Sequence, residues 1–152
     1  MQQSQQQTIA LLQSYYEAFN AQTIDVLLNT LADDVVHDIN QSQREVGKAA
    51  FHRYIKRLYT YYREHFFDIE IMTNENGSRA ATEYNVLGVY LYTDPGLPMA
   101  SGQTYRLPGG SFFETRGGKI SRVSVHYNMQ DWLAQVTYAD LQPVTAAPAT
   151  SI

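Results

Sequence analysis

Three polar side chains follow a short β-branched stretch in quick succession: His37, Asp38 and Asn40 come after Val35-Val36. A carboxylate or an imidazole held in an apolar pocket can remove a proton from the carbon next to a carbonyl. Neighbouring side chains of a strand point to opposite faces, so Asp38 and Asn40 share one face and His37 takes the other. Either Asp38 is the base in a pocket, or His37 faces inward and Asp38 lies on the surface. An aspartate at a strand end can also simply bond a backbone amide of the next turn.

Hydroxyl and carboxyl groups that could assist such a base occur at both ends of the chain. The sequence holds 12 tyrosines, and a tyrosine hydroxyl can either donate to a ligand carbonyl or complete a packed core. Tyr15 and Tyr16 lie on the apolar stripe of a predicted first helix, and Tyr127 ends the predicted last strand facing inward. Glu114, if buried, would be a second carboxylate for acid–base work. Trp132 is expected to pack inward and close the pocket.

Composition and motifs exclude several other kinds of site. The 152 residues include no cysteine, which rules out disulfides, thiolate metal sites and thiol catalysis. The four histidines lack metal-ligand spacing and no Gly-x-Ser-x-Gly motif is present, so neither a metal site nor a serine triad is predicted. The net charge of -4 argues against a nucleic-acid partner. With no apolar run near membrane length and a polar, Gln-rich start, we expect a cytoplasmic protein without a membrane span.

Hydrophobic periodicity predicts helices in the first part of the chain. Apolar residues recur at helical spacing in three segments, of which the third has a basic face that we expect to be solvated. Between the second and third segments come a short strand and a polar loop. The predicted elements are helices at 8–20, 23–31 and 47–62, a strand at 35–39 and a loop at 41–46.

After the third helix the apolar period changes to two, which is typical of strands. Asn74-Glu75-Asn76-Gly77 and Arg116-Gly117-Gly118-Lys119 predict tight turns, and Gly88 is a candidate bulge. Residues 1–7 are expected to fray, and the chain from Tyr138 onward to form a loose tail. The predicted elements are strands at 67–71, 79–92, 103–107, 110–115 (the last two separate or continuous past Pro108) and 120–127, with a closing helical turn at 131–136.

This order predicts an α+β fold in which three N-terminal helices pack on one face of a curved antiparallel sheet. The arrangement is cone-shaped and encloses an internal cavity between helices and sheet, where a ligand usually binds.

Several segments resemble known families. Leu11-Leu12-Gln13-Ser14-Tyr15, Phe19-Asn20-Ala21, Leu31-Ala32-Asp33-Asp34 and Asp38 resemble the opening of ketosteroid isomerase. Phe112-Phe113-Glu114, Gly117-Gly118-Lys119-Ile120 and Tyr127-Asn128-Met129-Gln130-Asp131-Trp132 resemble the SnoaL-like polyketide cyclases. Both families belong to the nuclear transport factor two-like (NTF2-like) superfamily, and the group that resembles the chain most is the ketosteroid isomerase-related proteins.

The resemblance implies roles for particular residues. The isomerase uses an Asp base with an oxyanion hole made by a Tyr and a protonated Asp. Tyr15 corresponds to the family tyrosine, and Asp38 corresponds to the base when a one-residue gap is placed in the strand. Gly110 and Ser111 stand where the isomerase has its acidic donor, so this chain departs from the family there.

Together these observations predict a single domain at 8–136 that binds a small apolar or polycyclic ligand with a carbonyl group. We expect an isomerase or cyclase that needs no cofactor; the alternative is a non-catalytic ligand-binding or dimerisation module of the same fold. A homodimer is expected through the free sheet face, with Tyr and Val exposed on it. The predicted catalytic residues are Asp38, Tyr15 and His37, and the predicted ligand-binding residues are Tyr16, Asn40, Glu114, Tyr127 and Trp132.

Overall fold

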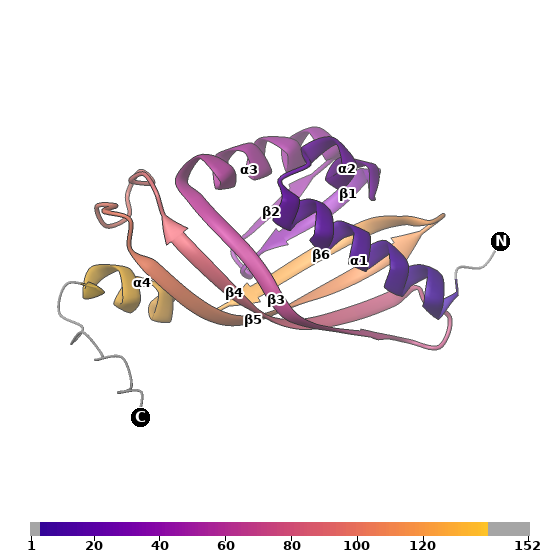
Figure 1. Ribbon diagram of the computed structural model, residues 1–152. Helices are drawn as coiled ribbons and strands as arrows, with labels where there is room; N and C mark the ends of the chain where they lie inside the picture. Colours follow the sequence, from indigo (N-terminus) through magenta and orange to yellow (C-terminus); the bar gives the residue numbers. More distant parts are fainter. Residues whose placement is uncertain (1–3, 140–152) are drawn as a thin grey trace, which may run out of the picture.

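The computed structural model describes residues 4–139. Four helices and a six-stranded sheet make up this part of the chain (Figure 1). The elements are α1 (Gln5–Ala21), α2 (Ile24–Asn29), β1 (Leu31–Ile39), β2 (Gln43–Val46), α3 (Lys48–Tyr61), β3 (Tyr62–Thr73), β4 (Arg79–Tyr90), β5 (Thr104–Arg116), β6 (Lys119–Tyr127) and α4 (Met129–Thr137).

The first helix begins earlier than its apolar stripe indicates. The Ser4 side chain accepts a hydrogen bond from the Gln7 backbone, and the Gln7 side chain accepts one from the Ser4 backbone. This capping box satisfies two free N–H groups at the helix end. The prediction that residues 1–7 fray is therefore wrong for residues 4–7. Residues 1–3, and all of the predicted loose tail beyond residue 139, lie outside the described residues.

The sheet has the strand order β2-β1-β6-β5-β4-β3. All neighbouring strands are antiparallel except β1 and β6, which run parallel. The predicted loop at 41–46 is wrong for its last four residues, because Gln43–Val46 forms the edge strand β2 paired with β1. This strand is mostly polar and largely exposed, so no alternation of apolar residues predicts it. Pairing with β1 stabilises it.

The sequence predicted a bulge at Gly88 and left open whether the strand is interrupted at Pro108. Pairing continues without interruption through Gly88, so the predicted bulge there is wrong. The register instead shifts between Phe67 and Glu70, where Asp68 adopts a left-handed conformation with φ of 50°. Phe67 precedes the shift and lies on the outer face, under the guanidinium of Arg106, whereas Ile69 and Ile71 after it pack against the core. Strand β5 runs past Pro108 without a break, which settles the alternative left open there.

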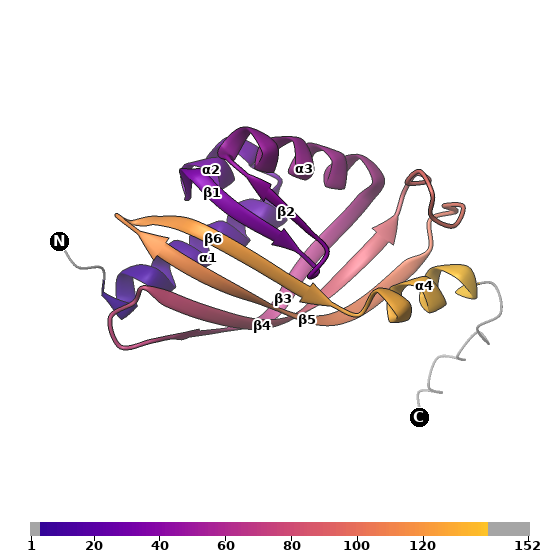
Figure 2. The same ribbon diagram turned by 180° about the vertical axis from the view of Figure 1, so that it is seen from behind.

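Helices α1 and α3 cover one face of the curved sheet, and α4 lies at the end of the sheet near the β4–β5 connection (Figure 1). From behind, the strands lie in front of α1 and their outer face is free of the N-terminal helices (Figure 2). The buried residues form a large cluster between α1, α3 and the sheet, and a smaller one around Tyr90 and Trp132. The predicted α+β cone is confirmed.

Candidate functional site

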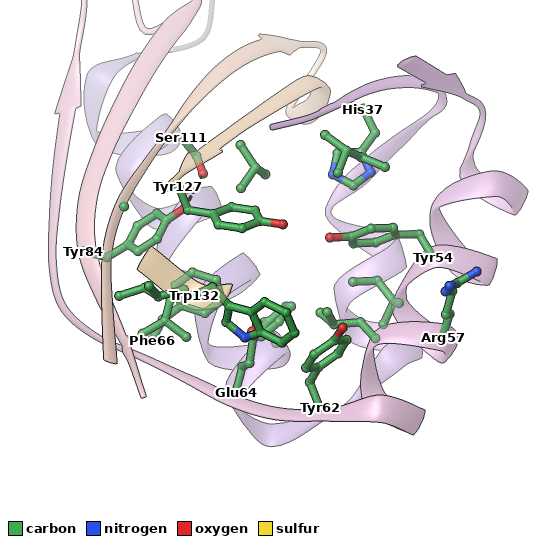
Figure 3. Close-up of a pocket in the computed structure, with 18 of the residues that line it drawn as sticks. His37, Tyr54, Arg57, Tyr62, Glu64, Phe66, Tyr84, Ser111, Tyr127 and Trp132 are labelled. Atoms are coloured by element: carbon green, nitrogen blue, oxygen red, sulfur yellow. Dashed lines mark hydrogen bonds between the residues drawn. The ribbon is translucent and has the colours of Figure 1, made fainter. Parts of the chain in front are cut away.

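A cavity of about 230 Å³ lies between the helices and the inner face of the sheet (Figure 3). Apolar and aromatic side chains form most of its wall, and a few polar groups interrupt it. Its lining comes from α1, β1, α3, β3, β4, β5, β6, α4 and the β4–β5 connection. The polar and aromatic residues that concern the chemistry are Tyr15, Tyr16, His37, Tyr54, Arg57, Tyr62, Glu64, Tyr84, Asp94, Ser111, Tyr127 and Trp132.

His37 faces the cavity from β1. Its exposed fraction is 2%, and its ring lies 4.6 Å from the ring of Tyr54 and 4.7 Å from that of Phe51, centroid to centroid. Neither ring nitrogen bonds to another described residue, and Nδ1 is fully buried. Burial lowers the pKa of the imidazole to about 4, although the charge of Asp38 acts in the opposite direction. The imidazole is therefore neutral near pH 7, and a neutral imidazole can accept a proton.

Three tyrosine hydroxyls on the cavity wall are free to bind a ligand. Within residues 4–139, the hydroxyls of Tyr15, Tyr54 and Tyr127 have no hydrogen-bond partner. Figure 3 shows those of Tyr54 and Tyr127 pointing toward each other across the cavity, with the His37 ring beside Tyr54. Burial raises the pKa of all three, so they stay protonated and can donate to a carbonyl oxygen.

Other hydroxyls of the wall are already engaged. The Tyr16 hydroxyl is 2.7 Å from Oγ1 of Thr82, and the Tyr84 hydroxyl is 2.9 Å from Oγ of Ser111. Tyr16 therefore lines the cavity, but its hydroxyl is bonded within the packed core. Ser111, which stands where the isomerase has its acid, uses its hydroxyl on Tyr84.

Asp38 points away from the cavity, so its predicted place as the base inside the pocket is wrong. Its carboxylate accepts hydrogen bonds from Nε and Nη2 of Arg44, at 2.7 and 3.0 Å, and from Nε of Arg122 at 3.0 Å. These guanidinium groups lower the pKa of Asp38. Because side chains alternate along β1, placing His37 inside places Asp38 outside.

Two further predicted ligand-binding residues do not line the cavity. Asn40 has a left-handed backbone, with φ of 45°, and its Oδ1 accepts a hydrogen bond from the Tyr127 backbone at 3.0 Å. It can position Tyr127 but does not contact the cavity itself. Glu114 is on the outer face, where it pairs with Arg79 at 3.5 Å and Arg122 at 3.8 Å. Glu114 was predicted from its strand neighbour Phe112, which proves to be half exposed on the same outer face.

The carboxylate that does line the cavity is Glu64 on β3, which the sequence analysis missed. The strand was predicted to begin at Phe67, whereas it begins at Tyr62. Tyr62, Glu64 and Phe66 alternate onto the inner face, and this period of two was the available signal. The Glu64 carboxyl accepts a hydrogen bond from the Tyr105 hydroxyl at 2.6 Å, and burial raises its pKa.

A second missed group joins the β4–β5 connection to the cavity wall. The Asp94 carboxylate accepts a hydrogen bond from Arg57 on α3 and one of 2.8 Å from the Tyr62 hydroxyl. Its backbone N–H donates to the hydroxyl of Tyr90. Leu97 of the same connection lines the cavity. The Arg57 side chain stays largely exposed, as predicted for the basic face of α3, and its guanidinium also binds the Asp94 carboxylate of this loop.

Among residues 4–139, no group of three or more His, Cys, Asp or Glu side chains is placed to hold a metal ion. None of the described helices is both long and apolar enough to cross a membrane.

Known proteins share this architecture. A family model described as SnoaL-like domain matches residues 12–123. A candidate polyketide cyclase from Xanthomonas campestris is 52% identical, with a TM-score of 0.85 over 87% of this chain and 98% of that one. Another from Pseudomonas putida is 50% identical, with a TM-score of 0.82 over 83% and 95%.

An epoxide hydrolase of Mycobacterium tuberculosis shares the fold at 15% identity, with a TM-score of 0.72 over 90% of this chain and 89% of that one. No functionally curated protein matches the sequence. The resemblance to SnoaL-like and ketosteroid isomerase-related proteins is confirmed: the chain belongs to the SnoaL-like family of the NTF2-like superfamily.

Proposed function

We propose that this protein is an isomerase or cyclase that removes a proton alpha to a carbonyl of a small apolar ligand. His37 is the base, and the hydroxyls of Tyr54 and Tyr127 bind the carbonyl oxygen. The observation that carries the proposal is a buried, neutral imidazole without a hydrogen-bond partner among the described residues, in the wall of the cavity. Buried polar atoms are nearly always paired, so an unpaired one in a cavity points to a ligand.

The chemistry follows from the arrangement of these groups. Loss of the proton turns the ketone into an enolate, whose negative charge develops on the carbonyl oxygen. Two hydroxyls aimed at that oxygen stabilise the charge more strongly in an apolar cavity than in water. The proton held by His37 can return at another carbon, which gives isomerisation. Alternatively, the enolate carbon attacks a second carbonyl, whose oxygen becomes an alkoxide and takes up the proton from His37, which gives cyclisation. Neither route requires a cofactor.

The relatives support the second route. The two proteins with about half of their residues identical to this chain are described as candidate polyketide cyclases. Cyclisation of such a substrate uses an enolate carbon as nucleophile, which is the species that the proposed base generates. The many aromatic side chains of the wall suit a flat, unsaturated ligand.

The test is deuterium exchange into a panel of cyclic ketones, followed by NMR. We expect His37→Gln to abolish exchange and His65→Asn, which changes an exposed histidine, to leave it unaltered. Asp38→Asn should retain exchange, because that carboxylate faces away from the cavity. If His37→Gln exchanges as fast as the wild type, His37 is not the base.

The alternative is a non-catalytic binding module of the same fold. One observation favours it: Ser111 stands where the isomerase has its acidic donor, and its hydroxyl is bonded to Tyr84. Ligand binding without exchange in the wild type would select this alternative.

We further propose a homodimer through the outer face of the sheet. Met72, Leu87 and Phe112 are each about half exposed there, and apolar patches on a sheet face mark interaction sites. The patch differs from the expected one, since the tyrosines of β4 and β5 face inward. Light scattering should give the mass of a dimer, and the double variant Leu87→Glu/Phe112→Glu the mass of a monomer. A monomeric wild type contradicts the proposal.

A further inference from the structure

The carboxyl group of Glu64 lies in the cavity wall but takes no part in the proposed proton removal. Figure 3 shows it on the opposite side of the cavity from His37. Oε1 accepts the hydrogen bond from the Tyr105 hydroxyl. Oε2 has no partner among residues 4–139, and no cation forms an ion pair with the group in this part of the chain. One carboxyl oxygen is therefore available to a ligand.

The position of this group depends on a glycine between two strands. Gly88 on β4 pairs with Glu64 on β3 and with Tyr105 on β5, so the three residues form one row across the inner face. A Cβ atom at position 88 would lie 2.1 Å from Cζ of Tyr105. Because Gly88 has no side chain, the Tyr105 ring lies across it and its hydroxyl reaches Glu64. The position of the Glu64–Tyr105 pair is thus fixed by the pairing of the strands.

The surroundings of Glu64 restrict what it can bind. Tyr62 and Phe66 flank it on the same face of β3, and Trp132 closes the wall. Burial among these rings raises the pKa of Glu64, and the Tyr105 hydrogen bond opposes the rise. An ionic ligand group such as an ammonium would need the fully ionised carboxylate, which an apolar cavity disfavours. A hydroxyl suits either protonation state, since it can donate to the carboxylate and accept from the acid.

We propose that Glu64 and Tyr105 form a second polar subsite that binds a hydroxyl group of the ligand. The ligand is then a hydroxylated aromatic ketone, with its carbonyl toward His37, Tyr54 and Tyr127 and its hydroxyl toward Glu64. This inference rests on the proposed function for the orientation of the ketone. It identifies Glu64 as the residue that discriminates among ketones of similar size.

Binding can be measured without turnover, because Trp132 is the single tryptophan and lines the cavity. Quenching of its fluorescence should be titrated with 6-hydroxy-1-tetralone and with 6-methoxy-1-tetralone, which has the same ring but no donor. We expect the wild type to bind the hydroxy ketone about tenfold tighter or more, as for a hydrogen bond to a charged or strongly polar group. Glu64→Leu should remove this preference. Glu70→Leu, on the outer face of the same strand, should keep it.

Equal affinity of the wild type for the two ketones, or no binding of either, overturns the proposal. The proposal is also overturned if Glu64→Leu still prefers the hydroxy ketone to the methoxy ketone. Tighter binding of the tetralone that carries an aminomethyl group in place of the hydroxyl would overturn it as well. If Glu64→Leu does not fold, Tyr105→Phe provides the second variant, and it should weaken the preference several-fold. The titration is repeated in His37→Gln. If His37→Gln still prefers the hydroxy ketone and the wild type shows no deuterium exchange, the proposed function is refuted but the proposed subsite is not.

Discussion

The buried imidazole of His37 predicts a specific dependence of stability on pH. Its pKa falls from 6.5 in the unfolded chain to about 4 in the folded protein. Between these values the unfolded state binds more protons than the folded state, so the free energy of unfolding rises with pH. The stabilisation is fully present above pH 6.5 and is lost as the pH falls toward 4.

The size of the effect follows from the same two values. Integration gives a loss of about 2 kcal/mol between roughly pH 8 and roughly pH 5, and a limit of about 3 kcal/mol below pH 4. The charged residues adjacent to His37 in the sheet are Asp38, next in sequence, and Glu45, the cross-strand partner on β2. Asp38 raises the pKa, but less than burial lowers it.

The matched variant is His37→Phe, which keeps a ring against Phe51 and Tyr54 but cannot titrate. Urea unfolding followed by circular dichroism at several pH values gives the free energy for each protein. The difference between variant and wild type should grow by about 2 kcal/mol from roughly pH 8 to roughly pH 5. Glu64, whose pKa is raised, loses its contribution as pH rises, but it is common to both proteins and cancels in this difference.

His65→Asn, which removes an exposed histidine on the outer face, should follow the wild type at every pH. Parallel curves for His37→Phe and the wild type would refute the reasoning, because His37 would then be solvated or charged in the folded protein.

Three other predictions concern the groups around the cavity. The pH profile of kcat/KM should rise through about pH 4 and be flat near neutrality, since the neutral imidazole of His37 is the active form; a midpoint near 6.5 would contradict this. Asp38→Asn should lower the free energy of unfolding by about 1 kcal/mol at neutral pH through the loss of its ion pairs with Arg44 and Arg122, with activity retained; loss of activity in a folded variant would return Asp38 to the mechanism. Asp94→Ala should cost about 2 kcal/mol in urea unfolding and weaken ligand binding, because the β4–β5 connection loses its links to α3 and β3; Tyr62→Phe, which removes one of these hydrogen bonds, should have a smaller effect.

Much of the fold was predictable because the apolar residues of long amphipathic segments recur with the period of a helix or of a strand. Helix α3 buries Phe51 and Ile55 as its spacing predicts, and β4 alternates buried and exposed residues along its whole length. The edge strand β2 was not predictable in this way. Three of its four residues are polar and the strand is largely exposed, and these residues become a strand because β1 offers free backbone groups to pair with.

The orientation of β1 shows where a resemblance was less informative than the local pattern. Val35, His37 and Ile39 alternate, and the structure places His37 and Ile39 in the cavity wall with Val35 buried. Aligning Asp38 with the base of ketosteroid isomerase required a gap, which would have reversed this face. The arginines that hold Asp38 outside, Arg44 and Arg122, come from two other strands, so their contact with it depends on a register that the sequence does not reveal.

Ionic and polar groups are distributed differently on the two faces of the sheet. On the outer face the carboxylates of Asp38 and Glu114 are both paired with Arg122, and each has a further arginine. On the inner face, within the described residues, Nδ1 of His37 and Oε2 of Glu64 have no partner.

Nδ1 of His37 is buried, and leaving a buried polar atom unpaired costs on the order of 1–3 kcal/mol, so a core under selection for stability alone would have replaced or paired this imidazole. Under the proposed function, a ligand that bonds to His37 recovers that free energy and stabilises the folded state by mass action. The unpaired atoms and the cavity they border are therefore best explained together, as a site that becomes complete when a ligand with polar groups at both ends occupies it.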